Sequence, residues 1–208
     1  ETDTQDITGT VLKECDPSEI TEETAKKCIE SFIGEYDQIP PMYSALKVNG
    51  KKLYELAREG KVVERKSRKV QIYDIRIKEM KLPRIRMEVS CSKGTYIRTL
   101  CNDVGEVLGV GGCMESLLRT KVSRFELKDS MKLADIEKAK NEGRTEEIIL
   151  PLDEVFVEYP KIIVTGRQAQ LAYNGNPFPK ESAKNLILPG KDGGEDDLSD
   201  IFSRYKKY

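Results

Sequence analysis

The chain has 208 residues, of which 38% are hydrophobic and 34% are charged, and its formal net charge is −1. This length suits one large domain, or one domain with a small appendage, and the apolar fraction allows a core with extended solvated faces. The near-neutral balance excludes a uniformly basic nucleic-acid binder, so the placement of the basic residues matters more than their sum.

Cysteine and histidine content narrows the chemistry. The sequence has five cysteines, without a Cys-x-x-Cys spacing, and no histidine. An odd cysteine count predicts reduced thiols in a cytoplasmic protein, and the missing paired spacing argues against a zinc ribbon. A chain without histidine cannot build a Ser-His-Asp or Cys-His site by itself. No apolar run reaches membrane-spanning length and the N-terminus lacks the shape of a signal peptide, so we expect a soluble protein.

The first residues predict one strand and one helix. Residues 10–12 have the pattern of a short strand. A helix is predicted to begin at Ser18, with acidic residues in its first turns, and to end at Gly34. The chain opens on polar residues without an initiator methionine, so we expect it to be a fragment of a longer protein.

A basic stretch follows two adjacent prolines. Asn49-Gly50 predicts a hairpin turn, and a helix is expected over residues 51–59. The basic residues of this stretch are Lys47, Lys51, Lys52, Arg58, Lys61, Arg65, Lys66, Arg68, Lys69 and Arg76. Two interpretations are open. Such a run usually forms a solvated face, whereas the interleaved Tyr43, Tyr54 and Tyr73 would suit phosphate contacts with base stacking.

The most informative stretch is a strand that turns into a helix. Alternating patterns predict strands over 69–77 and 85–89, joined by a turn near 81–83. A glycine then breaks the second strand, and Thr95 is placed to cap a helix. From Tyr96 onward the apolar period is helical.

This strand-to-helix corner, residues 91–98, carries a cation, an aromatic ring and a guanidinium in Lys93, Tyr96 and Arg98. Three interpretations are open. In the first, Arg98 pairs with a structural carboxylate and Tyr96 packs. In the second, Cys91 is the nucleophile of a phosphate loop, although six residues separate it from Arg98, one more than a tight cysteine-phosphatase loop allows. In the third, the arginine holds a catalytic carboxylate through two hydrogen bonds while the tyrosine stacks on a base.

The downstream part predicts shorter elements. We expect Met114, Leu117 and Leu118 to continue an apolar helix face. The remaining predicted elements are a returning strand near 122–125, a helix over 134–140, a strand over 160–164, a helix over 166–173 and a turn over 174–177. At Pro151 a charge-rich sequence gives way to a new apolar pattern, so a small β-rich accessory module is expected from there on.

Several stretches are highly specific in combination. They are Thr2-Asp-Thr-x-Asp-x-x-Gly9, Gln38-x-Pro-Pro-x-Tyr-Ser-Ala-x-Lys47, Leu53-Tyr-Glu-x-Ala-Arg-x-Gly60 and Cys91-Ser-Lys-Gly-Thr-Tyr-Ile-Arg98, followed by Leu117-Leu-Arg-Thr120 and Pro151-Leu-Asp153. In this order they resemble the bacterial TruB family, the tRNA pseudouridine-55 synthases, over most of residues 1–160.

The resemblance implies an α+β fold. Residues 1–150 would form an N-terminally truncated pseudouridine-synthase catalytic domain, with a mostly antiparallel central sheet and flanking helices. Residues 151–208 would form a PUA-like RNA-binding module. The implied reaction isomerises the T-loop uridine-55 of tRNA to pseudouridine without cofactor or metal. An aspartate is the nucleophile, and the target uridine is flipped out to reach it.

The resemblance also implies roles for individual residues. Arg98 would be catalytic, since it pairs with the nucleophilic aspartate and keeps it ionised and aimed. Tyr96, Leu117 and Lys93 would contact the substrate uridine. An insertion at about 36–70 would clamp the T-arm of tRNA. Its expected tRNA contacts are Tyr43, Lys47, Arg58, Arg65 and Arg68.

One departure from the family pattern is serious. The family's catalytic aspartate lies in a Gly-Thr-Leu-Asp-Pro motif, which this sequence does not contain. Asp3 and Asp6 are interpreted as turn residues and Asp103 as a structural residue of the helix after Arg98. We therefore expect the 208 residues alone to be inactive.

Two other function classes stay open beside the enzyme. One is a non-catalytic RNA-binding protein with the same fold, and the weaker one is a hydrolase that uses Cys91. We expect a monomer for a complete protein and self-association for a fragment whose sheet edge is exposed.

Overall fold

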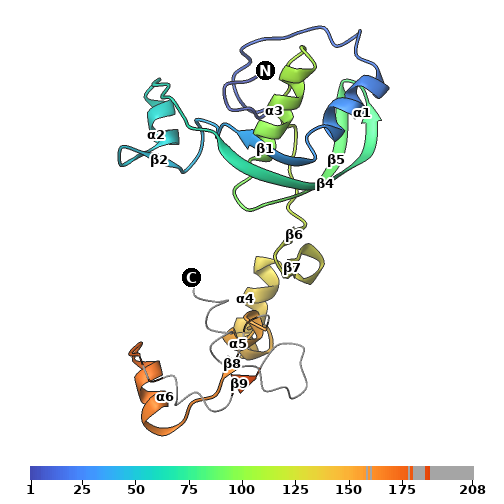
Figure 1. Cartoon of the computed structure of the whole chain (residues 1–208). Coiled ribbons are helices and arrows are strands. Elements are labelled where there is room, and N and C mark those ends of the chain that lie inside the picture. Colours follow the sequence, from blue (N-terminus) through green and yellow to red (C-terminus); the bar gives the residue numbers. More distant parts are fainter. Residues whose placement is uncertain (158, 160, 178, 180–185, 188–208) are drawn as a thin grey trace. The chain divides into compact units, whose positions relative to one another are not determined.

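The computed structural model describes residues 1–157, 159, 161–177, 179 and 186–187, and it divides the chain into two compact units, Glu1–Leu127 and Lys128–Tyr208 (Figure 1). Each unit is described by itself. Within the described ranges, no helix is both long and apolar enough to cross a bilayer. The predicted module at 151–208 falls largely outside the described residues and stays a prediction.

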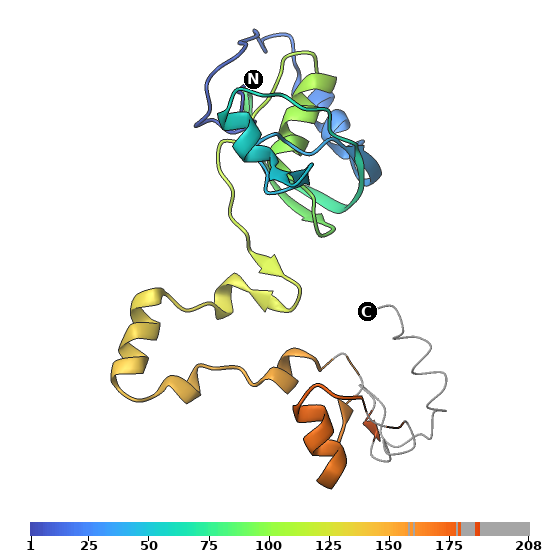
Figure 2. The same ribbon diagram turned by 90° about the vertical axis from the view of Figure 1, so that its left-hand side faces the viewer.

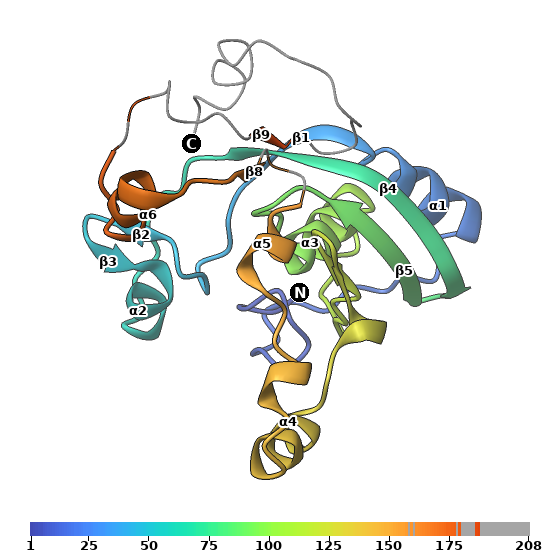
Figure 3. The ribbon, with the colours of Figure 1, turned by 90° about the horizontal axis from the view of Figure 1, so that it is seen from below.

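The first unit is built on a three-stranded antiparallel sheet with the order β1-β4-β5 (Figure 3). β1 is Gly34–Gln38, β4 is Arg68–Lys81 and β5 is Arg84–Cys91. The predicted strands at 69–77 and 85–89 are therefore confirmed, and both are longer than expected. The mixture of helices with an antiparallel sheet also confirms the expected α+β class.

Two bulges keep the apolar side chains of β4 on one face. The apolar positions that are fully or partly buried are 70, 72, 75, 77 and 80. A strict two-residue alternation would turn 75 and 77 away from the face that 70 and 72 share. Register shifts between Ile72 and Asp74, and between Ile77 and Glu79, each add one residue to β4 opposite β5. Each added residue restores the apolar face.

Two helices cover that apolar face. They are α1, Glu22–Glu30, and α3, Ile97–Val107, which lie on the same side of the sheet (Figure 1). The buried core that they form with β4 consists of Cys28, Ile29, Ile72, Ile75, Leu100 and Val104. Gly105 of α3 allows a very close approach, because a Cβ there would lie 2.1 Å from the carbonyl carbon of Gly111.

Helix α1 begins later than predicted. The Thr21 hydroxyl accepts a hydrogen bond from the backbone N–H of Thr24 at 3.1 Å and caps the helix. The backbone N–H of Ser18 instead donates to Asp16, in a turn before the helix. The predicted start at Ser18 was therefore wrong. The predicted end was also too late, because Gly34 has a φ of +120° and begins β1.

The cap predicted for α3 was also wrong. Tyr96, with φ −96° and ψ 106°, is the N-cap residue, and no side-chain hydrogen bond caps the helix at this position. The Thr95 hydroxyl instead bonds within the turn before the helix, where it donates to the carbonyl of Ser92 at 2.9 Å.

Two further expectations on irregular segments failed. Residues 10–12 form only an isolated bridge, between Thr2 and Val11. The segment after α3 is not helical, because Gly111 has a φ of +71° and Met114 forms a parallel bridge with Asp6. As a result Leu117 and Leu118 are exposed instead of continuing a helix face.

The segment between β1 and β4 folds as predicted. A hairpin joins β2, Lys47–Val48, to β3, Lys51–Lys52, and Asn49 and Gly50 both have positive φ values, as the tight turn requires. Helix α2, Leu53–Arg58, follows and buries Leu53 and Leu56. It projects with the hairpin from the end of the sheet where β4 begins (Figure 1, Figure 2).

The remaining elements are short. They are β6 (Lys121–Val122), β7 (Phe125–Glu126), η1 (Leu127–Asp129), α4 (Leu133–Asn141), η2 (Thr145–Glu147), α5 (Leu152–Val155), β8 (Lys161–Ile162), α6 (Gly166–Tyr173) and β9 (Leu186–Ile187). The predicted helices at 134–140 and 166–173 are confirmed. The strand predicted near 122–125 is a short hairpin, β6–β7, and that predicted over 160–164 is only β8.

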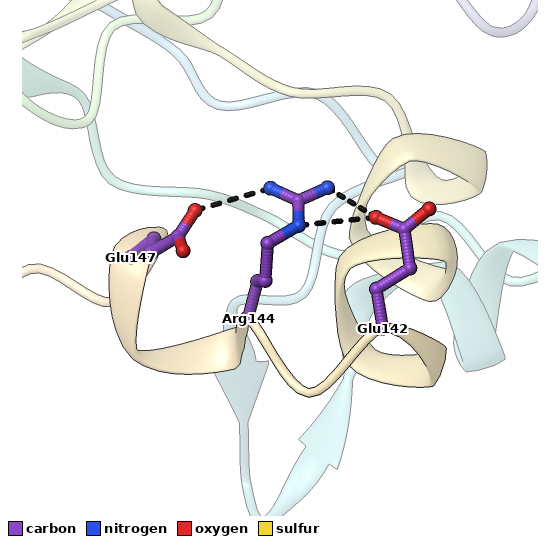
Figure 4. Close-up of polar contacts among 3 residues, drawn as sticks. All are labelled: Glu142, Arg144 and Glu147. Carbon is purple, nitrogen blue, oxygen red and sulfur yellow. Dashed lines mark hydrogen bonds and ion pairs between the residues drawn. The ribbon is translucent and has the colours of Figure 1, made fainter.

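The turn after α4 is fixed by an exposed arginine. The Arg144 guanidinium lies between Glu142 and Glu147, donating to Glu147 at 3.1 Å and from its Nε to Glu142 at 3.0 Å (Figure 4). These pairs are largely solvated, so we expect them to orient the turn more than they stabilise the unit.

Packing of β4 against the two helices predicts an asymmetry between neighbouring residues. Ile72 is fully buried, so Ile72→Ala should lower the free energy of unfolding by about 2–5 kcal/mol. Tyr73 is 61% exposed, so Tyr73→Ala should change it by only about 0.5 kcal/mol. Urea unfolding followed by circular dichroism measures both values, and equal losses would contradict this account of the core.

Candidate functional site

The corner that joins β5 to α3 is held by a buried side chain from β1. Gln38 is 1% exposed. Its Oε1 accepts a hydrogen bond from the backbone N–H of Tyr96 at 2.8 Å, and its Nε2 donates to the Tyr96 carbonyl at 3.0 Å. The same Nε2 also donates to the hydroxyl of Tyr36. The backbone on which Tyr96 and Arg98 sit is thereby tied to the end of β1.

Arg98 extends from the first turn of α3 and is partly buried. Its Nη2 donates to the backbone carbonyl of Tyr43 at 2.6 Å. The structure therefore brings together three residues that the sequence analysis selected: Tyr43, Tyr96 and Arg98. A guanidinium has five N–H donors, so one neutral carbonyl leaves most of its hydrogen-bonding capacity for an anionic partner.

Asp6 is a carboxylate whose pKa is lowered in the folded protein. Hydrogen bonds from the hydroxyl and backbone N–H of Thr8 lower the pKa of Asp6, and the charge of Arg98 lowers it further. The backbone of Thr10 donates to Asp3 at 2.8 Å. Both carboxylates thus act in turns, as expected, but the influence of Arg98 on Asp6 was not anticipated. Nothing in the spacing of the two residues indicates it.

The other expected substrate residues are less well placed. Lys93 lies exposed in the turn of the corner, and Leu117 is 55% exposed in an irregular segment. Neither side chain belongs to the hydrogen-bond network of Gln38 and Arg98 described above. Their contacts with a substrate stay predictions.

Basic and aromatic side chains meet on α2 and the adjacent hairpin. The Lys52 ammonium and the Arg58 guanidinium each lie 5.3 Å from the centroid of the Tyr54 ring. Lys52 also donates to the Tyr54 hydroxyl at 3.2 Å. Such an arrangement offers an exposed cation beside a ring on which a base can stack. Arg58 was an expected RNA contact, and its i, i+4 spacing from Tyr54 is a signal in the sequence that the two side chains meet. Lys52 was not among the expected RNA contacts.

The remaining expected RNA contacts differ in their surroundings. Lys47 and Arg68 are exposed, as phosphate contacts require. Arg65 is partly buried, and its Nη1 donates to the carbonyl of Pro40 at 3.1 Å. We therefore expect Arg65 to hold the proline segment in place in addition to any RNA contact.

Burial changes the acidity of three groups near α3. Burial raises the pKa of the Asp103 carboxyl to about 6, against a hydrogen bond from Asn102 that lowers it. Burial also raises the pKa of Tyr36, and the nearby Asp103 adds to that effect. The pKa of Cys101 rises to about 11, chiefly through burial. This thiol is therefore a poor nucleophile at neutral pH.

Cys91 does not have the surroundings of a phosphate loop. It pairs with Ile72 across the sheet, and its side chain packs against the hydrophobic core. A thiol directed into the core cannot face a phosphate held at the corner, so the geometry disfavours the hydrolase interpretation. Among the residues that the structure describes, no cluster of three or more His, Cys, Asp or Glu side chains could hold a metal ion.

Two family models match consecutive parts of the chain. The model described as TruB family pseudouridylate synthase (N terminal domain) matches residues 1–97. The model described as tRNA pseudouridylate synthase B C-terminal domain matches residues 98–157. The junction between the two matches therefore falls at the start of α3, within the corner.

Curated relatives carry the same name. The chain is 49% identical over 162 residues to tRNA pseudouridine synthase B of Lachnoclostridium phytofermentans, covering 74% of this chain and 53% of that protein. It is 47% identical over 174 residues to the protein of that name from Clostridium tetani, covering 84% of this chain and 59% of that protein. The chain thus spans little more than half the length of these relatives.

Solved structures show the same fold. A crystal structure of a Cbf5-Nop10-Gar1 complex matches with a TM-score of 0.58 at 25% identity, covering 76% of this chain and 45% of that chain. A structure of an H/ACA RNP bound to a substrate RNA containing 2'-deoxyuridine matches with a TM-score of 0.55 at 21% identity. This match covers 76% of this chain and 44% of that chain. The second likeness bears on the fold alone.

The raised pKa of Asp103 predicts a pH-dependent stability. The folded state holds the proton more tightly than the unfolded state, so this group's contribution to stability falls as the pH rises from about 4 to about 6. Asp103→Asn should remove that fall. It should stabilise the protein at pH 7 by on the order of 1 kcal/mol after allowance for solvent screening, with no gain below about pH 4.

Urea unfolding between those pH values, with and without the substitution, measures the difference. Because the sequence has no histidine, no imidazole titration overlaps this range. A gain that is the same at all pH values would show that Asp103 is ionised normally in the fold.

Proposed function

Because this chain belongs to the TruB family of pseudouridylate synthases, we propose that the protein is a tRNA pseudouridine synthase that converts the T-loop uridine-55 of tRNA to pseudouridine. The observation that carries the proposal is the corner at which Tyr96 and Arg98 are fixed by Gln38, beside a segment that presents Lys52, Tyr54 and Arg58. An anionic nucleophile and a uracil ring would both find partners there.

The proposed reaction is an isomerisation, so its atoms and electrons balance without a further reactant. The bond between N1 of uracil and C1′ of the ribose breaks, and an aspartate nucleophile assists that departure. The base turns, and a bond forms between C5 and C1′. The proton on C5 is lost to solvent while N1 gains one. No redox step occurs, and no metal or cofactor is required.

Arg98 has the geometry to position and ionise a carboxylate. Its guanidinium is partly buried and fixed at one end by the Tyr43 carbonyl. In such surroundings a positive charge strongly favours the ionised form of a nearby carboxyl group. Tyr96, the N-cap residue of α3, would stack on the flipped uridine.

None of the three aspartates considered so far, Asp3, Asp6 and Asp103, suits the role of nucleophile. Asp3 and Asp6 accept hydrogen bonds within their own turn. Asp103 lies in α3, and among the described residues it forms no ion pair with Arg98. The 208 residues contain no Gly-Thr-Leu-Asp-Pro run. We therefore propose that these residues alone bind RNA but do not catalyse the reaction.

The tRNA would be held by the segment 36–70. Lys47, Arg58 and Arg68 are exposed and can contact phosphates, while Tyr54 offers a ring for stacking.

The missing aspartate motif also favours a second candidate, a non-catalytic RNA-binding protein of the same fold. Free cysteines at all five positions suit the reducing cytoplasm in which tRNA is modified.

Tritium release separates these candidates. A T-arm stem-loop with 5-tritiated uridine should bind to the 208-residue chain without releasing tritium, and the affinity should fall steeply as salt rises. The product of the complete gene should release tritium from the same RNA. Release by the 208 residues alone would show that the nucleophile lies within them, whereas no release by either protein would support the non-catalytic alternative.

Arg98→Ala in the product of the complete gene should separate catalysis from binding. Without the guanidinium the nucleophile is neither aimed nor held ionised, so we expect kcat to fall by at least about a hundredfold. The dissociation constant for tRNA should change by less than about threefold, because Arg65 still holds the proline segment and the cations around Tyr54 are retained. Single-turnover tritium release and filter binding measure the two quantities. Equal losses in both would mean that Arg98 is only structural.

A further inference from the structure

The amide of Gln38 occupies a position that a neighbouring strand would otherwise fill. In an antiparallel pair, a hydrogen-bonded residue exchanges both an N–H and a C=O bond with the residue opposite. Tyr96 has an extended backbone, and both of its main-chain groups bond to the side chain of Gln38, at 2.8 and 3.0 Å. One side-chain amide thus replaces a backbone partner.

A carboxamide of this length can make all three hydrogen bonds at once. The amide presents one acceptor oxygen and two N–H donors. The oxygen serves the Tyr96 N–H, while the nitrogen serves both the Tyr96 carbonyl and the Tyr36 hydroxyl. A glutamate at this position, when ionised, has no donor. An asparagine is shorter by one methylene group.

Water cannot easily take the place of this amide. Gln38 is 1% exposed, and the Tyr96 N–H lies before the first turn of α3, where no carbonyl of the helix can reach it. The Tyr96 carbonyl already accepts the backbone N–H of Leu100 at 3.0 Å, as the helix requires. Removing the amide would therefore leave a partly buried donor without its partner.

The same contacts fix the direction in which Arg98 leaves the helix. Two bonds from Gln38 hold Tyr96, two residues before it. On the other side, the buried Thr99 hydroxyl donates to the side chain of Gln5 at 2.7 Å. The Arg98 guanidinium itself bonds to Tyr43, five residues after Gln38. A rotation of the first turn would break these bonds and displace the guanidinium.

We propose that Gln38 is a positioning residue: by holding the backbone of Tyr96, its amide aims Arg98 at the catalytic carboxylate and couples the start of the RNA-binding segment to the corner. The part of this proposal that concerns catalysis rests on the proposed function. The part that concerns the backbone does not, so the two can fail separately.

The first test measures the backbone alone. In the 208-residue chain, Gln38→Ala should speed hydrogen exchange at the Tyr96 amide by at least about tenfold, because the buried acceptor is lost. The matched control is Gln71→Ala, which removes a partly buried glutamine side chain from β4, the neighbouring strand of the same sheet. It should leave that amide protected. Unchanged exchange in Gln38→Ala would overturn the proposal.

The second test measures catalysis in the product of the complete gene. Gln38→Ala should lower kcat by about 10- to 100-fold, the loss typical of a misaligned catalytic group, while KM for tRNA changes by less than about threefold. Gln71→Ala should leave both values close to those of the parent. A loss in KM alone, or the same loss in the control, would show that Gln38 does not position Arg98.

Gln38→Glu keeps the test decisive if the alanine variant does not fold. Burial favours the neutral form of a glutamate here, and a protonated carboxyl group again offers one donor and one acceptor. The kcat of Gln38→Glu relative to that of the parent should therefore stay close to one where the carboxyl group is protonated and fall at any pH at which it ionises. A ratio that stays low at all pH values would overturn the proposal. If the parent makes no pseudouridine, the proposed function has failed. The part of the proposal that concerns the backbone is then tested by comparing hydrogen exchange at the Tyr96 amide in Gln38→Glu with that in the parent.

Discussion

Two hydrogen bonds between the Gln38 side chain and the Tyr96 backbone join parts of the chain that lie 58 residues apart. They connect the last residue of β1 to the residue at which α3 begins. The sheet and helix α3 share one core, so this connection also links the hydrophobic packing of the unit to its polar corner. Because the bonded groups are buried, the corner is a fixed part of the fold, unlike most exposed loops.

The placement of the segment between β1 and β4 follows from the same connection. It begins next to Gln38, passes the Tyr43 carbonyl that binds Arg98, and ends beside Arg65, whose guanidinium returns to Pro40. Arginine side chains therefore hold its proline-rich start from two directions. The hairpin and α2 beyond it remain exposed, with their cations around Tyr54. A base held by hydrogen bonds and an exposed far end suit the RNA-binding role proposed for this segment.

Local signals in the sequence predicted most elements, and contacts between distant residues explain the failures. Alternation identified β4 and β5, and Asn49-Gly50 identified the hairpin. A motif identified Tyr96 and Arg98, but the role of Gln38 depends on a partner far along the chain. The Thr95 cap failed because Tyr96 takes the N-cap position, where Gln38 holds its backbone, and the helix face after α3 failed because Met114 pairs with Asp6. No periodicity reveals such competition.

The bulges of β4 have a consequence for how this strand can change length. Elsewhere in the strand, the loss of one residue would turn every later side chain to the opposite face. At Ile72–Asp74 or Ile77–Glu79 the loss of the extra residue would instead leave a plain alternation, with the same side chains facing the helices. This strand can therefore lose a single residue at either of these two places, where the cost is a straighter strand and not an inverted core.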